Sequence, residues 1–264
     1  MVKSIFDIEN RLDIQHEFKK MVKVLHGDRI GNYSDSNSYM GMIERFIFTR
    51  WEYRDTIIDV EEYLMHIGIT KDILKTGNIE NETFLYYLQF ILNMEYMKSK
   101  LDMKGLTKDN ERVILSNIPL ILEKMNYTYY NFEDKVLISK RNADTDSVIN
   151  KIPMSLSQRV LEYNDFRIQD NIEEKKKILK DIDLYIEKIK NSISSIDGKL
   201  VDSIGTIVNK MGVNHPIDLE FKSLSEKELI KWYDKCYLMM LHAIRSLEIQ
   251  KIKKERENLV SSNK

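Results

Sequence analysis

The residues best suited to chemistry lie in a short corner in the last third of the chain, where Lys210, Asn214 and His215 precede Pro216. A histidine exchanges a proton near neutral pH, so His215 could act as general base or acid when a ribose 2′-hydroxyl attacks the adjacent phosphate of RNA. Such metal-free cleavage also needs a cation for the developing charge, which Lys210 could supply. Asn214 could orient the phosphate or the imidazole. These three residues are therefore candidate catalytic groups.

The same corner also has a purely structural interpretation. Gly212 and Pro216 are residue types that end a helix and begin a loop, and His215 would then be hydrogen-bonded within the turn. The sequence alone leaves both interpretations open.

A second histidine stands at a ribonuclease-like spacing near the N-terminus. Arg11-Leu-Asp-Ile-Gln-His16 spells R-x-x-x-x-H, the spacing of a known ribonuclease motif. Leu12 stands where that motif usually has a polar residue, and a chain with five His can show one such match by chance. We therefore predict that any nuclease activity depends on His215 and not on His16.

A cluster of guanidinium and aromatic groups offers candidate nucleic-acid contacts at Arg50, Trp51 and Arg54. Arginines can hold phosphates, and an aromatic ring can stack on a base. The alternative interpretation is a packed tryptophan with ion pairs around its rim.

Long amphipathic helices are predicted to position the C-terminal corner. Apolar residues recur at three- and four-residue spacing between Asp170 and Ile196, a short helix follows, and the same period returns after Ser225. Asp170 with Glu173, and Ser225 with Glu228, fit the reciprocal capping pattern that begins a helix. The broad apolar stripes carry large aromatic residues, so we predict self-association through these C-terminal helices.

The rest of the chain predicts a mainly α protein made of helical bundle domains. One small β-hairpin is expected near residues 127–139, because Tyr127–Phe132 and Val136–Ser139 are rich in β-branched and aromatic residues. Pro119 predicts a kink or a helix restart, since it lacks the donor that a helix interior requires. The polar segment after the hairpin suggests two domains, residues 1–145 and 146–264.

Composition limits the class of protein. The 264 residues are 42% hydrophobic and carry a net charge of −1, which provides a sizeable core but no strongly basic footprint for duplex DNA. A single cysteine and the absence of a signal-like or membrane-spanning apolar segment predict a soluble cytoplasmic protein. Common nucleotide, zinc and serine-hydrolase motifs are missing, so we expect no metal or cofactor.

Four segments together resemble bacterial abortive-infection proteins of the AbiJ-like group, whose C-terminal domain is related to the HEPN helical fold. They are Phe48–Asp55, Phe84–Asn93, Ile118–Ile138 and Lys231–Tyr237. The resemblance implies a role in phage defence, dimerisation through helices and RNA cleavage at an Arg/His site. The sequence departs from the HEPN pattern at Lys210, where an arginine is expected, and lysine lacks the planar fork of arginine.

Two functions from different classes follow from the sequence. In the first, the protein is a defence-associated, metal-independent ribonuclease that uses His215, Lys210 and Asn214 on RNA. In the second, it is a non-catalytic helical sensor or scaffold that binds a partner protein or nucleic acid. Whether His215 faces a groove with a cation nearby or packs under its loop would discriminate them.

Overall fold

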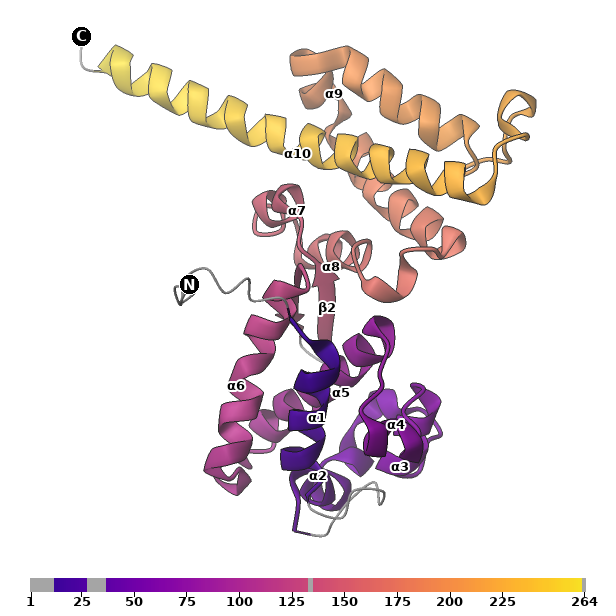
Figure 1. Cartoon of the computed structure of the whole chain (residues 1–264). Helices are drawn as coiled ribbons and strands as arrows, with labels where there is room; N and C mark the ends of the chain where they lie inside the picture. Colours follow the sequence, from indigo (N-terminus) through magenta and orange to yellow (C-terminus); the bar gives the residue numbers. More distant parts are fainter. Residues whose placement is uncertain (1–11, 28–36, 133–134, 263–264) are drawn as a thin grey trace, which may run out of the picture. The chain divides into compact units, whose positions relative to one another are not determined.

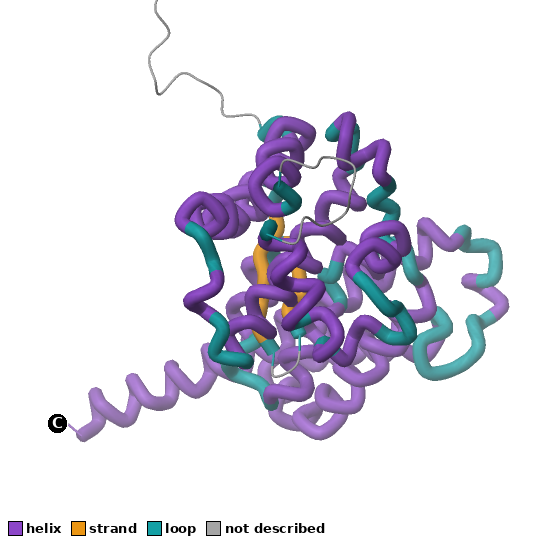
Figure 2. The backbone as a smooth tube through the Cα atoms, turned by 90° about the horizontal axis from the view of Figure 1, so that it is seen from below, coloured by secondary structure: helices purple, strands orange, loops and turns teal. Residues whose placement is uncertain are grey.

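The computed structural model describes residues 12–27, 37–132 and 135–262, and these residues are mainly α-helical (Figure 1). Figure 2 shows one pair of strands in the described part of the chain. They are β1 (Tyr127–Asn131) and β2 (Val136–Lys140), which form a hairpin. The predicted fold class and the position of the hairpin are therefore confirmed. Glu133 and Asp134, between the two strands in the sequence, lie outside the described residues.

The chain divides into two compact units, residues 1–138 and 139–264. The end of β2 belongs to the second unit because Ser139 forms an antiparallel bridge with Asp165 and the Lys140 amide donates to the Asn164 carbonyl at 2.8 Å. The boundary expected from the sequence, after residue 145, falls inside helix α7 (Ala143–Val148). The polar segment that suggested a linker begins this helix, since the Asn142 side chain accepts from two amides of its first turn.

The first unit is built from six α-helices joined by short loops and 3₁₀ turns in its described part. They are α1 (Ile14–Leu25), α2 (Tyr39–Phe46), α3 (Val60–His66), α4 (Lys71–Thr76), α5 (Asn81–Lys100) and α6 (Asp109–Lys124). Side-chain oxygens of Asp13, Ser38, Asp59 and Thr70 accept from amides of the first turns of α1 to α4. These N-caps satisfy donors that would otherwise lack a partner, so they fix where each helix begins.

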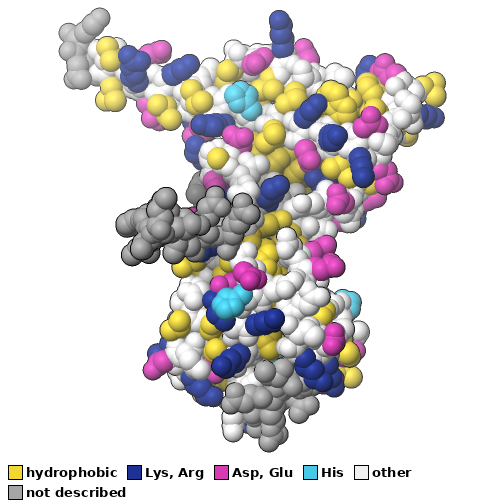
Figure 3. Space-filling view, in the orientation of Figure 1, with side chains coloured by type: hydrophobic (Ala, Val, Ile, Leu, Met, Phe, Trp, Pro, Cys, Tyr) yellow, Lys and Arg dark blue, Asp and Glu magenta, His cyan; other side chains and the backbone are white. Residues whose placement is uncertain are grey.

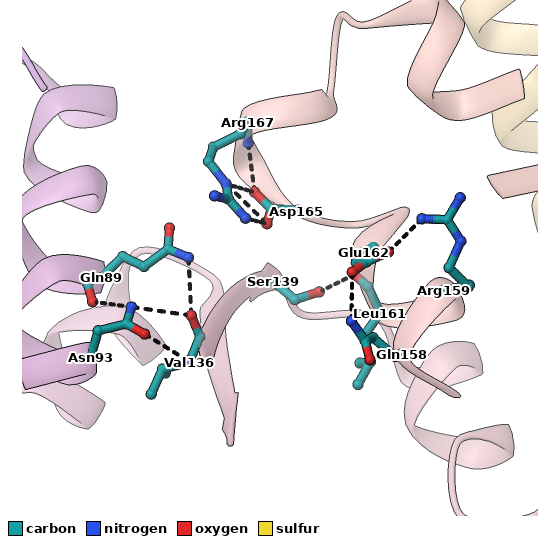
Figure 4. A network of polar contacts seen from close by, with 10 residues as sticks. All are labelled: Gln89, Asn93, Val136, Ser139, Gln158, Arg159, Leu161, Glu162, Asp165 and Arg167. Atoms are coloured by element: carbon teal, nitrogen blue, oxygen red, sulfur yellow. Dashed lines mark hydrogen bonds and ion pairs between the residues drawn. The ribbon is translucent and has the colours of Figure 1, made fainter. Parts of the chain in front are cut away.

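Helix α5 forms the centre of this unit and is buried on more than one side, as its broad apolar surface predicts. Two of its polar side chains are also buried: Gln89 and Asn93 bind the backbone of Val136, with the Val136 amide 2.9 Å from Asn93 Oδ1 (Figure 4). They hold the first residue of β2 against the helix. The expected helix restart at Pro119 does not occur, because α6 continues through it. A helix can lose one backbone hydrogen bond when packing on neighbouring turns keeps it in place, and Ile118 and Leu122 beside Pro119 are fully buried.

The second unit consists mainly of two long helices. After α7 and α8 (Met154–Glu162), α9 (Ile172–Lys210) and α10 (Glu226–Ser262) lie along one another (Figure 1). Asp197 is non-helical (φ −149°, ψ 91°), and its side chain accepts from the Leu200 amide, so α9 is a long segment followed by a shorter one, as predicted. The buried face between the helices is apolar and aromatic, with Ile182, Tyr233 and Met240 fully buried.

The two predicted caps of these helices have different outcomes. Ser225 and Glu228 form the expected reciprocal pair, with the Ser225 amide 2.9 Å from Glu228 Oε2. At α9 the cap is Asn171, whose Oδ1 accepts from the Glu174 amide, and not Asp170. Every described helix is too short or too polar to cross a lipid bilayer.

Candidate functional site

The predicted corner is a tightly bonded turn between α9 and α10. Gly212 has a φ of +87°, and a Cβ there would lie 2.6 Å from the Ile217 side chain, so only glycine fits without a shift. The Tyr233 hydroxyl donates to the Met211 carbonyl at 2.7 Å, and the backbone amide of Asn214 donates to the Val208 carbonyl at 3.0 Å. The corner is thereby fixed to both long helices.

The three predicted catalytic residues share this corner but have different partners. The Lys210 ammonium is paired with Glu220 at 3.2 Å, and the Asn214 amide nitrogen donates to Asp183 of α9 at 2.9 Å. His215 is exposed to solvent. The cation and the side-chain amide nitrogen are therefore occupied by partners within the protein, while the imidazole is accessible. This arrangement agrees with a structural role for Lys210 and Asn214.

Asp183 of α9, which accepts from Asn214 of the corner, has a pKa that is shifted by its surroundings. Burial raises the pKa of its carboxyl, and the hydrogen bond from Asn214 partly offsets that rise. A raised folded-state pKa adds stability that is complete below the unfolded-state pKa and is lost as the pH rises through the folded-state pKa. At neutral pH the protein therefore carries the cost of a buried carboxylate.

We expect Asp183→Asn to raise the free energy of unfolding at pH 7 by on the order of 1 kcal/mol, because it removes the charge and keeps an acceptor for Asn214. Urea denaturation should show this gain shrinking as the pH falls through the raised pKa of Asp183, where the wild-type carboxyl takes up its proton. Asp202→Asn, at an exposed position of the same helix, should give no gain. A less stable Asp183→Asn variant at pH 7 would contradict the electrostatic explanation.

Of the three predicted nucleic-acid contacts, Trp51 is used for packing. Trp51 is 4% exposed, and its ring lies edge-on to Tyr63 with 5.2 Å between centroids. Arg54 donates to the Ile57 carbonyl at 2.6 Å, and Arg50 is exposed. Because the tryptophan is buried, it offers no ring for a base to stack on. The alternative of a packed tryptophan describes this cluster better. His16 is exposed on α1, and its motif partner Arg11 lies outside the described residues.

A polar pocket lies in the second unit, and sequence reasoning missed it. Its volume is about 360 Å³. The lining residues come from the end of β2 and from the ends or faces of α7 to α10: Lys140, Arg141, Asn142, Tyr163, Asn164, Gln169, Asp170, Lys175, Ile230, Asp234, Tyr237 and Leu238. This volume lies within the range of about 300–1,000 Å³ that is usual for small-molecule sites.

A buried lysine forms one wall of this pocket. Lys175 is 4% exposed; its ammonium lies 2.5 Å from Asp234 Oδ1 and 4.5 Å from the centroid of the Tyr163 ring. The Tyr163 hydroxyl donates to the same Asp234 oxygen at 3.0 Å, and burial followed by the nearby Asp234 charge raises the pKa of Tyr163. Tyr163 is therefore a neutral donor at physiological pH, and the lysine charge is balanced by Asp234.

Two stacked tyrosines support that wall. The Tyr163 and Tyr237 rings lie 4.1 Å apart and are nearly parallel, and the Tyr237 hydroxyl donates to the Val160 carbonyl at 2.8 Å. Thr145 and Asn164 also bond this hydroxyl at 2.8 Å. The aromatic pair therefore joins α8 and α10 to the loop before α9.

One sequence signal could have indicated this site. Lys175 falls three residues before Ile178, on the apolar stripe of α9, and Asp234 lies between two buried tyrosines of α10. A charged residue on a buried stripe needs an ionic partner, so two such positions on helices expected to pack together indicate a pair.

Comparison with known proteins identifies no relative. No family model matches the chain, and searches of curated proteins and of solved structures find no significant match.

Proposed function

We propose that the protein is a non-catalytic helical scaffold or sensor that assembles with a second copy of itself through the C-terminal third of α10. The observation that carries this proposal is the exposure of that third: residues 251–261 are all exposed, although they form a continuous helix. Apolar side chains are included, with Ile252, Leu259 and Val260 more than half exposed. In Figure 3 yellow side chains occur along this part of the helix.

A helical extension of this kind gains little stability alone. Isolated helices of about a dozen residues are marginal in water, and most helical stability comes from packing of an apolar face. Here the face is formed by Ile249, Ile252 and Leu259, at spacings of three and seven residues. These spacings place them on one seam, as the a and d positions of a short coiled coil.

Charges beside the seam favour a second copy in parallel register. With Ile249 and Ile252 as a and d, Glu248 takes a g position and Lys253 an e position, so parallel chains bring Glu248 of each near Lys253 of the other. An antiparallel pairing instead brings glutamates toward glutamates and lysines toward lysines. Arg256 occupies the remaining a position, where a single polar residue fixes register at a cost in stability.

Static light scattering tests the assembly. We expect the wild-type protein at micromolar concentration to show twice the 31.4 kDa of one chain, and Ile252→Glu/Leu259→Glu to show the single-chain mass. The matched control is Met154→Glu/Leu219→Glu, which introduces the same charges at exposed apolar positions of the same unit outside α10. A wild-type protein that remains monomeric would refute the proposal.

The proposed biological setting is phage defence. Its support is the resemblance of the four segments described above to abortive-infection proteins, with a soluble, cytoplasmic location. A plaque assay in cells that express the chain, compared with cells expressing the α10 variant, tests this setting. We expect protection by the wild type that the variant loses.

A second candidate function is metal-independent cleavage of RNA at His215. The favouring observation is that His215 is exposed while its neighbour Asn214 is anchored to Asp183, so the imidazole is presented from a fixed loop. Total RNA incubated with the purified protein should then be cleaved by the wild type and by the control His242→Ala, whose histidine is also exposed, but not by His215→Ala. Loss with His16→Ala alone would overturn the assignment of His215.

A further inference from the structure

We propose that protonation of His242 weakens the α10 assembly, so that two copies are joined at neutral pH and separate in acid. This inference rests on the proposed function, because it concerns the regulation of the same interface. His242 is exposed on α10, about two turns before Ile249 of the seam. A histidine changes its charge between about pH 5 and 8, so its place in the repeat decides whether the contact depends on pH.

The coiled-coil repeat of α10 continues toward the N-terminus beyond Ile249. Counting back by the same spacings places Arg245 at d, His242 at a and Leu238 at the preceding d position. All three side chains are exposed. The side chains at the neighbouring b and c positions are buried instead: Cys236, Tyr237, Ala243 and Ile244. Helix α10 therefore buries its b and c side in its own unit and leaves the a and d line open. We call this line, from Leu238 to Leu259, the extended seam.

A second copy gains stability by following the whole extended seam. The apolar residues Ile249, Ile252 and Leu259 lie within a short stretch, and helices of about a dozen residues are marginal in water. Leu238 is 42% exposed and supplies a further apolar residue at d. Contact from Leu238 to Leu259 extends over about 32 Å of helix. It buries one more pair of leucines and places His242 inside the interface.

In a parallel dimer the two His242 side chains face each other, as the two copies of any a residue do. A neutral imidazole is an uncharged polar group at this position, whereas two imidazolium ions repel one another. The flanking g and e residues are Leu241 and Ser246, which provide no negative charge. The dimer therefore binds protons less readily than the separate chains do. By linkage, association weakens as the pH falls through the titration range of histidine.

The charged groups that α7 and α9 bring to α10 have other partners. Arg245 of the extended seam lies 3.5 Å from Asp144 of α7. Other charged residues packed near α10 are Asp146 of α7, Lys151 of the turn after α7, and the buried Lys175 and Asp183 of α9. Among the described residues, His242 forms no hydrogen bond or ion pair with any of them. An imidazolium at residue 242 therefore lacks a counter-charge in the described part of its own chain.

Light scattering over a dilution series at one ionic strength measures the dissociation constant of the dimer at pH 8.0 and 5.5. We expect the wild-type constant to rise at least about tenfold at pH 5.5, because two like charges then face each other. His242→Gln keeps a polar side chain that does not titrate, so its constant should be equal at the two pH values. The matched control is His66→Gln, which removes an exposed histidine of α3 in the first unit and should keep the wild-type response.

A permanent charge at the same position mimics the acidic state. His242→Lys should bind at pH 8.0 as weakly as the wild type binds at pH 5.5. The circular dichroism of wild-type helices should be the same at both pH values. A lower helical signal at pH 5.5 would show that unfolding, and not His242, separates the chains.

The outcomes distinguish this inference from the assembly on which it rests. A wild-type dimer with equal dissociation constants at pH 8.0 and 5.5 would overturn the role of His242 and leave the α10 interface standing. An equal rise in the wild type and in His242→Gln would also overturn it, because another group would then be titrating. A wild type that is a single chain at pH 8.0 would refute the α10 assembly and this inference together.

Discussion

Tyr237→Ala is expected to lower the free energy of unfolding of the second unit by about 4 kcal/mol, the cost of truncating a large buried aromatic residue. Tyr237 is 1% exposed and stacks on Tyr163 at 4.1 Å. Its hydroxyl also bonds the Val160 carbonyl, Thr145 and Asn164. The truncation therefore leaves a cavity together with polar groups that have lost a partner.

The reactivity of the Cys236 thiol measures the loss of stability of the second unit specifically, because this cysteine belongs to that unit. Its thiol is fully buried next to Tyr237 in the chain, and burial raises its pKa to about 12, so it reacts with a disulfide reagent only after the second unit opens. The control is Tyr237→Phe, which keeps the ring and should lose about 1–2 kcal/mol. Equal losses in the two variants would show that ring packing is not the main contribution.

Asp234→Ala is expected to cost about 3 kcal/mol, because it leaves the ammonium of Lys175 buried without its counter-charge. Lys175 is the buried partner, with 6% of its side chain exposed, whereas 48% of the Asp234 side chain is exposed. The reverse substitution, Lys175→Met, keeps the aliphatic volume and leaves a carboxylate that water can solvate. It should cost less than about 1 kcal/mol.

Denaturation of both variants, followed by the reactivity of the Cys236 thiol, measures the difference between their costs in stability. The ion-pair energy is lost in each variant. A difference between them therefore reports which charge is buried, together with the hydrogen bond from Tyr163 that only Asp234→Ala removes. Equal costs, or a larger cost for Lys175→Met, would contradict the described geometry of the pair.

The sequence predicted those elements whose cause is local. The β-hairpin follows from residue types within a window of thirteen residues, and the Ser225–Glu228 cap is formed by two residues three positions apart. The start of α9 shows the limit of such reasoning. Asp170 and Asn171 are both good N-caps and are followed at the same spacing by Glu173 and Glu174, so local chemistry does not choose between them.

The features that sequence reasoning missed depend on contacts between distant residues. The segment around Trp51 has the composition of a nucleic-acid-binding cluster, but the burial of Trp51 depends on Tyr63 and Phe90 from other helices. The pocket in the second unit likewise depends on α9 and α10, which place Lys175 beside Asp234. These two residues are 59 positions apart in the sequence. In the corner, the sequence identified the exposed histidine but not the partners of Lys210 and Asn214.

Disulfide trapping at α10 tests the proposed assembly most directly. In a parallel coiled coil the two copies of d residue 252 face each other, so Ile252→Cys should give a covalent dimer on a non-reducing gel after mild oxidation. The wild-type protein should not, because Cys236 is fully buried. Lys254→Cys, on the outer face of the same helix, should remain a single chain. Equal trapping at residues 252 and 254, or none at 252, would contradict assembly through this seam.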